Sequence, residues 1–160
     1  MDIKFSVENV KKLEEDFKHY PTKQAVLLNA LWLAQEQFGW ISKEVMEYVG
    51  DFLDIPYEHV LGVVQFYTMF NKKQIGKYHL QVCTNVSCML RGGYDTMDYI
   101  SKKLDLKPGE TTPDGKFSLT EVECLGSCGT APMMQVNNTF EEKLTHEKID
   151  IIISELSKKR

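Results

Sequence analysis

Four cysteines are the residues whose type and spacing could do chemistry in this chain, and it contains no others. They form two close pairs: four residues lie between Cys83 and Cys88, and three lie between Cys124 and Cys128. Thiolates are the ligands preferred by iron–sulfur clusters and are also common ligands of zinc. If the fold brings the pairs together, they offer four thiolates, which is two for each iron of a [2Fe–2S] cluster.

The residues around the cysteines are also suited to a cluster. Ser87 lies inside the first loop, Gly126 lies inside the second, and Gly129 follows it. Small residues let backbone N–H groups approach sulfur closely, and such contacts tune the reduction potential of a cluster. Arg91 follows the first pair and could offset the negative charge of a cluster, although an ordinary surface arginine is the simpler interpretation.

Other uses of four cysteines compete with this interpretation. The spacing also fits structural zinc, and an even number of cysteines permits disulfides. Met1–Phe5 lacks the apolar core of a secretory signal, so we expect a reducing compartment. A Cys-x-x-Cys dithiol and the three close cysteines of plant-type ferredoxins are absent, and His79, the nearest histidine, lies outside the loops that a Rieske centre would need. The residues favour an iron–sulfur cluster but leave zinc and disulfides open.

Several motifs together carry a resemblance to a known family. They are Tyr20-Pro-x-Lys-Gln-Ala25, Val60-Leu-Gly-Val-Val-Gln-Phe66-Tyr67-Thr-Met-Phe70, Val82-Cys83-x4-Cys88, Thr112-Pro-Asp-Gly-Lys116, and Val122-Glu-Cys124-Leu-Gly-Ser-Cys128-Gly-Thr-Ala-Pro132. Over nearly its whole length the chain resembles the thioredoxin-like [2Fe–2S] ferredoxins, the family of the small E subunit in the NADH-oxidising module of respiratory complex I. The cysteine motif shows no departure from the family pattern.

The resemblance implies a function for the four cysteines. It implies that Cys83, Cys88, Cys124 and Cys128 ligate one [2Fe–2S] cluster and that the chain carries single electrons as a subunit of NADH:quinone oxidoreductase. It implies a flavoprotein partner that binds NADH and FMN, and a position at the cytoplasmic face of the inner membrane through the complex. Relatives also serve NAD-linked hydrogenases and formate dehydrogenases, so a corresponding role there is an alternative. The remaining alternative is an interaction module that is stabilised by zinc.

Composition and missing motifs limit what the chain can bind by itself. The 160 residues carry a net charge of −4, which argues against nucleic acid as a partner. The longest apolar candidate, Ala25–Ala34, is interrupted by Asn29 and is too short to span a membrane, so we expect no direct insertion. The sequence has no Gly-x-Gly-x-x-Gly motif after a strand and no P-loop. We therefore expect neither NADH nor flavin, and no catalytic residue, on this chain.

Residues 1–74 have the periodicity of a helical bundle domain. The predicted helices begin after Ser6, after Thr22, after Ser42 and near Pro56, and the second of them ends at Gly39. The aromatic run Phe66–Phe70 could form an interface, but we predict that it belongs to the core, because so short a bundle has little else to bury.

Residues 75–160 change to the pattern of an α/β domain. Strands are predicted at Tyr78–Val82 and Phe117–Val122, with a helix between them that begins near Gly92-Gly93. A hairpin of Met133–Val136 and Thr139–Lys143 turns at Asn137-Asn138, and Thr145 caps a last helix. This β-α-β-β-β-α order predicts a thioredoxin-like mixed sheet. Both cysteine loops then leave the C-terminal ends of the first two strands, which would bring the two pairs together.

Overall fold

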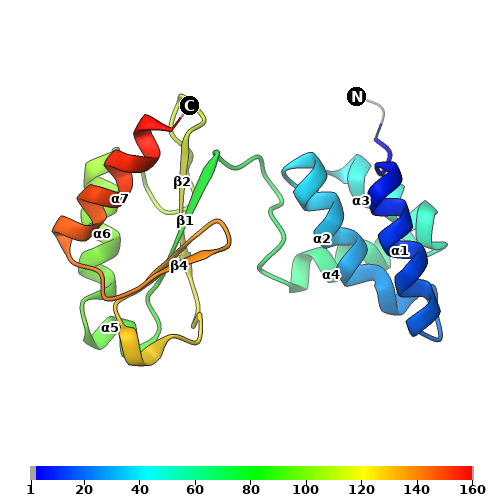
Figure 1. The fold of residues 1–160 in the computed structure, drawn as a ribbon, viewed down its shortest axis with the longest axis horizontal. Helices are drawn as coiled ribbons and strands as arrows, with labels where there is room; N and C mark the ends of the chain where they lie inside the picture. The colour runs from blue at the N-terminus through cyan, green and yellow to red at the C-terminus, as the bar shows by residue number, and fades with distance from the viewer. Residues whose placement is uncertain (1–2, 160) are drawn as a thin grey trace. The chain divides into compact units, whose positions relative to one another are not determined.

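The computed structural model describes residues 3–159, so Met1, Asp2 and Arg160 lie outside the described residues, including part of the Met1–Phe5 stretch. The chain groups into two compact units that divide between Gln74 and Ile75. Figure 1 shows that the first unit is helical and that the second combines helices with a sheet. Each unit is described by itself.

The first unit consists of helices whose ends follow simple capping rules. Its elements are α1 (Val7–His19), the 3₁₀ turn η1 (Lys23–Val26), α2 (Leu27–Phe38), α3 (Lys43–Leu53) and α4 (Tyr57–Phe66). The hydroxyls of Ser6 and Ser42 accept hydrogen bonds from the backbone N–H groups of Asn9 and Val45, as the sequence predicts. Gly39 ends α2 with a φ of 85°, a value that costs glycine little.

The expected cap at Thr22 is wrong. The Thr22 hydroxyl makes no capping bond, and the chain first forms η1 before α2 begins at Leu27. The backbone explains the difference, because the N–H of Ala25 donates to the carbonyl of Thr22 at 3.2 Å and closes a tight four-residue turn of the 3₁₀ kind.

The core of the first unit is apolar and has an aromatic end. Leu13, Leu31 and Val49 are fully buried in it. The ring of Phe5 packs edge-on against Tyr48 and Phe52, with ring centroids 5.2 and 5.3 Å apart. Such edge-to-face pairs stabilise a core beyond the area they bury.

The aromatic run after α4 corrects a second expectation. Phe70 is buried as predicted, but the side chains of Phe66, Tyr67 and Met69 are 77%, 37% and 42% exposed. Phe66 is the last residue of α4 and is not among its buried residues, Val60 and Val64, and the residues after it are no longer helical. Gln35 then holds the segment from both sides: its amide donates to the carbonyl of Met69 at 3.0 Å and accepts from the N–H of Asn71 at 2.6 Å. Only Phe70 is turned back into the core.

The second unit is built on a four-stranded mixed sheet in the order β2-β1-β3-β4. The strands are β1 (Tyr78–Cys83), β2 (Phe117–Val122), β3 (Met134–Val136) and β4 (Thr139–Glu141). Strands β1 and β2 are parallel, whereas β1 with β3 and β3 with β4 are antiparallel. This confirms the predicted mixed sheet.

Helices cover one face of this sheet. In Figure 1, α6 (Gly93–Leu104) and α7 (His146–Lys158) lie on the same side of the strands. Their apolar faces meet Leu80, Val82 and Leu119 in a common core. Thr145 caps α7 as predicted, with its hydroxyl accepting from the N–H of Lys148.

The opposite face of the sheet carries a buried histidine. His79 alternates with the core residues of β1 and its ring nitrogen Nε2 lies 2.8 Å from the hydroxyl of Thr120 on β2. Burial lowers the pKa of His79 from 6.5 to about 4, so the ring is neutral at physiological pH. His79 is therefore a structural residue, consistent with its place outside the cysteine loops.

Two local features of the second unit differ from the expectation. The first cysteine loop contains a short helix, α5 (Val86–Leu90), which no periodicity could reveal in five residues. Asn85 caps it, since its side chain accepts from the N–H of Val86. In the hairpin turn, Asn137 has a positive φ of 52°, whereas the φ of Asn138 is not positive. Only one of the two asparagines therefore has the expected backbone conformation.

A close backbone approach joins α5 to α6. At Gly93, the first residue of α6, an added Cβ would lie 2.9 Å from the carbonyl oxygens of Cys83 and Cys88. Such atoms are backbone and cannot rotate away, so a side chain here would push the first cysteine loop off the sheet. Glycine is required by space at this position.

We therefore expect Gly93→Ala to lower the free energy of unfolding of the metal-free second unit by about 1–3 kcal/mol, because overpacking displaces backbone. Urea unfolding followed by amide exchange in β1 and α6 measures it. Gly62→Ala in α4 is the matched control: no atom lies within 4 Å of its added Cβ, so it should not destabilise. Equal stability of the two variants would contradict the packing argument.

Candidate metal centre

The four cysteines lie at one end of the sheet, where β1 and β2 both finish. Cys83 is the last residue of β1 and pairs in register with Val122, the last residue of β2. Cys88 lies in α5, and Cys124 and Cys128 follow β2, the latter at the start of the 3₁₀ turn η2 (Cys128–Thr130). Figure 1 draws α5 and the gold turn of η2 at the same end of the strands. The parallel pairing thus brings together loops that are far apart in the sequence.

The sulfurs of the second pair lie close together. The Sγ atoms of Cys124 and Cys128 are 3.7 Å apart. A tetrahedral metal ion that binds two sulfurs at about 2.3 Å holds them about 3.8 Å apart. The second pair therefore already has the spacing that one metal ion needs. All four cysteines are free thiols, so they form no disulfide in this structure.

The two pairs differ in their contact with solvent. Cys83 and Cys88 are buried, whereas Cys124 and Cys128 are exposed. Burial raises the pKa of the Cys88 thiol to about 11, and the neighbouring Cys83 thiol acts in the same direction. A backbone hydrogen bond from Met133 opposes the shift by favouring the thiolate. A metal ion bound by Cys88 must therefore displace a firmly held proton.

A small apolar cluster surrounds the buried pair. Ala131 and Met133, which precede β3, pack against the two buried cysteines, and Leu125 of the second loop adds a partly buried side chain. The N–H of Cys83 also donates to the carbonyl of Met133 at 3.2 Å. These contacts keep water away from the side chains of Cys83 and Cys88.

Polar contacts connect the first loop to the end of β2. The hydroxyl of Thr84 donates to the carboxylate of Glu121 at 2.6 Å, and the amide of Asn85 donates to the carboxylate of Glu123 at 2.6 Å. Within the second loop, the N–H of Gly126 donates to the sulfur of Cys124 at 3.4 Å. The last contact is of the N–H···S kind that the glycine in this loop predicts.

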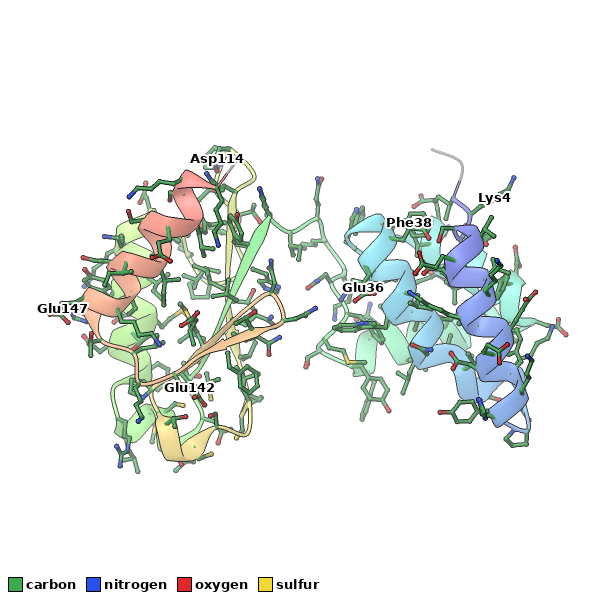
Figure 2. All side chains as sticks on the ribbon, in the orientation of Figure 1. Lys4, Glu36, Phe38, Asp114, Glu142 and Glu147 are labelled. Carbon is green, nitrogen blue, oxygen red and sulfur yellow. The ribbon has the colours of Figure 1, made fainter. Side chains whose placement is uncertain are left out.

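One contact of the second loop was missed by sequence reasoning. The hydroxyls of Ser127 and Thr130, on either side of Cys128, both donate to the same carboxylate oxygen of Glu142, with a distance of 2.7 Å from Thr130. These bonds lower the pKa of Glu142. Figure 2 shows Glu142 beyond the hairpin, next to the loop that contains η2. No spacing rule relates this glutamate to the cysteines, because the hairpin lies between them.

Arg91 lies at the exposed C-terminal end of α5. Its effect on the charge of a cluster stays a prediction. Among residues 3–159, no three His, Cys, Asp or Glu side chains, the four cysteines included, are placed to share a single metal ion, and no helix is both long and apolar enough to cross a bilayer.

Comparisons with known proteins agree with this geometry. The E subunit of NADH-quinone oxidoreductase from Rickettsia felis is 45% identical over 156 residues, which cover 96% of this chain and 93% of that protein. NADH-quinone oxidoreductase subunit 2 of Thermus thermophilus is 40% identical over 147 residues, or 90% of this chain and 81% of that protein.

A solved structure shares the fold. The NAD⁺-reducing [NiFe]-hydrogenase in its air-oxidised state matches with a TM-score of 0.73 at 19% identity, over 82% of this chain. The match spans 23% of the hydrogenase chain, so it compares a part of that protein. The model of the thioredoxin-like [2Fe–2S] ferredoxins matches residues 13–157 and includes both cysteine pairs. The chain belongs to the thioredoxin-like [2Fe–2S] ferredoxin family.

Proposed function

We propose that the chain is a one-electron carrier of NADH:quinone oxidoreductase that holds one [2Fe–2S] cluster on Cys83, Cys88, Cys124 and Cys128. The observation that carries the proposal is the meeting of two thiol pairs at the end of β1 and β2, one pair with its sulfurs 3.7 Å apart. The family and the names of the relatives support it.

The donor set fits a binuclear cluster. Two pairs of thiols supply two ligands to each iron, with Cys83 and Cys88 on one iron and Cys124 and Cys128 on the other. Soft sulfur donors without histidine also favour iron–sulfur chemistry.

When bound, the [2Fe–2S] group would supply one-electron reduction and reoxidation. The surroundings of the bound group would have a buried side and an exposed side. Ala131 and Met133 exclude water on the side of the buried pair, and the exposed pair leaves an approach for a redox partner. Electron transfer needs close approach but no bond making, so the chain requires no catalytic residue.

The electrons must come from another protein. A hydride carries two electrons, and a one-electron centre cannot accept it directly. A flavoprotein partner that binds NADH and FMN would take the hydride and pass single electrons to this chain. Through that complex the chain would lie at the cytoplasmic face of the inner membrane. We also propose that residues 75–160 form the cluster domain and residues 1–74 a helical bundle domain without ligands.

Two exposed apolar surfaces are the candidate contacts with the flavoprotein. On α5, next to Cys88, the side chains of Val86 and Leu90 are 61% and 76% exposed. At the end of α4, Phe66 and Tyr67 are exposed and stack edge-on. Exposed apolar side chains that gather beside a functional group are typical of protein interfaces. The α5 surface is the better candidate because it adjoins the cysteine loops.

Protein purified without oxygen should contain two irons and two acid-labile sulfides per chain, because that is the composition of the cluster. Iron and sulfide assays and the visible absorption of the protein measure this. Cys124→Ala should lose the cluster, while the helices of residues 7–66 keep their amide protection, since they contain no ligand. One zinc per chain without sulfide would overturn the assignment.

The chain alone should neither bind NADH nor reduce ferricyanide with it. Co-expressed with the flavoprotein partner, it should co-purify as a heterodimer in which NADH reduces the flavin. Leu90→Glu should weaken this pairing, because it places a charge in an apolar interface. Phe66→Glu tests the second surface in the same way.

Ile151→Glu on α7 is the matched control for the pairing experiment. Its side chain is also exposed, at 58%, but lies on the helix far along the chain from the cysteine loops. Equal pairing of Leu90→Glu and Ile151→Glu would remove α5 from the interface. NADH oxidation by the isolated chain, free of flavin, would contradict the need for a partner.

A further inference from the structure

The loop that contains Cys128 is hydrogen-bonded to the residue that follows the β3–β4 hairpin. Glu142 follows β4 directly and accepts hydrogen bonds from the hydroxyls of Ser127 and Thr130. The same two hydroxyl oxygens lie 2.7 Å from each other, and that of Thr130 lies 3.1 Å from the carbonyl oxygen of Ser127. Each hydroxyl has one proton, so with both protons donated to Glu142 these are close polar contacts and not further hydrogen bonds. One carboxylate thus closes a ring of polar contacts around the cysteine between them.

The backbone reinforces this attachment. The N–H of Lys143 donates to the carbonyl of Thr130 at 2.8 Å, and the N–H of Leu144 donates to the carbonyl of Pro132 at 2.9 Å. The ammonium of Lys148 on α7 donates to the carbonyl of Glu142 at 2.8 Å. These bonds fix the backbone of Glu142 and of the two residues after it. The carboxylate of Glu142 in turn holds the second cysteine loop by hydrogen bonds.

The attachment matters because the second pair has little other support. Cys124 and Cys128 are exposed, and few apolar contacts hold their loop. Cys128 can stay 3.7 Å from Cys124 only if the residues beside it are fixed. Hydrogen bonds to a charged group are stronger than neutral ones, so the two bonds to Glu142 are an important anchor of this loop.

We propose that Glu142 is a positioning residue for the second cysteine pair and that its negative charge lowers the reduction potential of the bound group. The inference rests on the proposed function. Reduction adds a negative charge, and a fixed carboxylate beside the loop opposes that addition. The same carboxylate slows the loss of the group, because it keeps the loop of Cys128 closed.

The experiment uses the full chain with its cluster, loaded without oxygen. Two quantities are measured: the midpoint potential in a titration followed by the spectrum of the cluster, and the half-life of the visible absorption in excess chelator. Glu142→Gln should shift the potential to a more positive value and shorten the half-life about tenfold, since it removes a charge-assisted acceptor. Glu142→Asp keeps the charge but is too short to reach both hydroxyls. It should shorten the half-life with a smaller shift in potential.

Glu141→Gln is the matched control. It removes the same charge from the adjacent residue, whose carboxylate pairs with Lys148 on α7 at 3.1 Å. It should keep the wild-type half-life and shift the potential less than Glu142→Gln. Glu142→Gln with the half-life and potential of Glu141→Gln would overturn the inference.

Two further variants remove the hydroxyl donors of these hydrogen bonds, and they replace Glu142→Gln as the test if that variant does not fold. Ser127→Ala and Thr130→Val each remove one hydroxyl and should each shorten the half-life. When either substitution is combined with Glu142→Gln, the half-life should change little further, because the shared acceptor is already lost. Fully additive effects would contradict the ring of contacts. Wild-type protein without a cluster would refute the proposed function, whereas a loaded wild type with unchanged variants would refute only the role of Glu142.

Discussion

The parallel pairing of β1 with β2 is the constraint on which the site depends. Its register sets Cys83 against Val122, so both strands end at the same level. The loops that follow are then forced to share one edge of the sheet, and the two cysteine pairs meet there although the α5–α6 crossover separates them in sequence. A one-residue slip of this register would turn Cys83 to the opposite face and separate the pairs.

Much of this arrangement could be predicted because it follows from periodicity and from cysteine spacing. The strand Phe117–Val122 and the cap at Ser42 are local features, and local sequence determines them. The exposure of Phe66 is not local. Phe66 is the last residue of α4, and the path of the chain after it depends on Gln35, which bonds the backbone of Met69 and Asn71 on either side of the buried Phe70.

The sequence predicts candidate ligands, but it does not reveal the residues that support them. Thiol spacing identifies the cysteines because the chemistry of metal binding demands it. The supports obey no such rule. Glu142 meets Ser127 only because a hairpin folds back across the loop, and α5 is too short to give a helical pattern. Residues that hold a site are selected by three-dimensional proximity, so one sequence without a structure does not reveal them.

The unequal burial of the two cysteine pairs gives the loading of the site a direction. Cys83 and Cys88 pack against Ala131 and Met133, whereas Cys124 and Cys128 face the solvent. Iron and sulfide supplied to the folded chain would reach the exposed thiols first. Transfer would then proceed inward, from the accessible ligands to the enclosed ones. Damage by oxidants or alkylating agents would follow the same route, so the solvent-facing pair is the point at which the empty protein is most vulnerable.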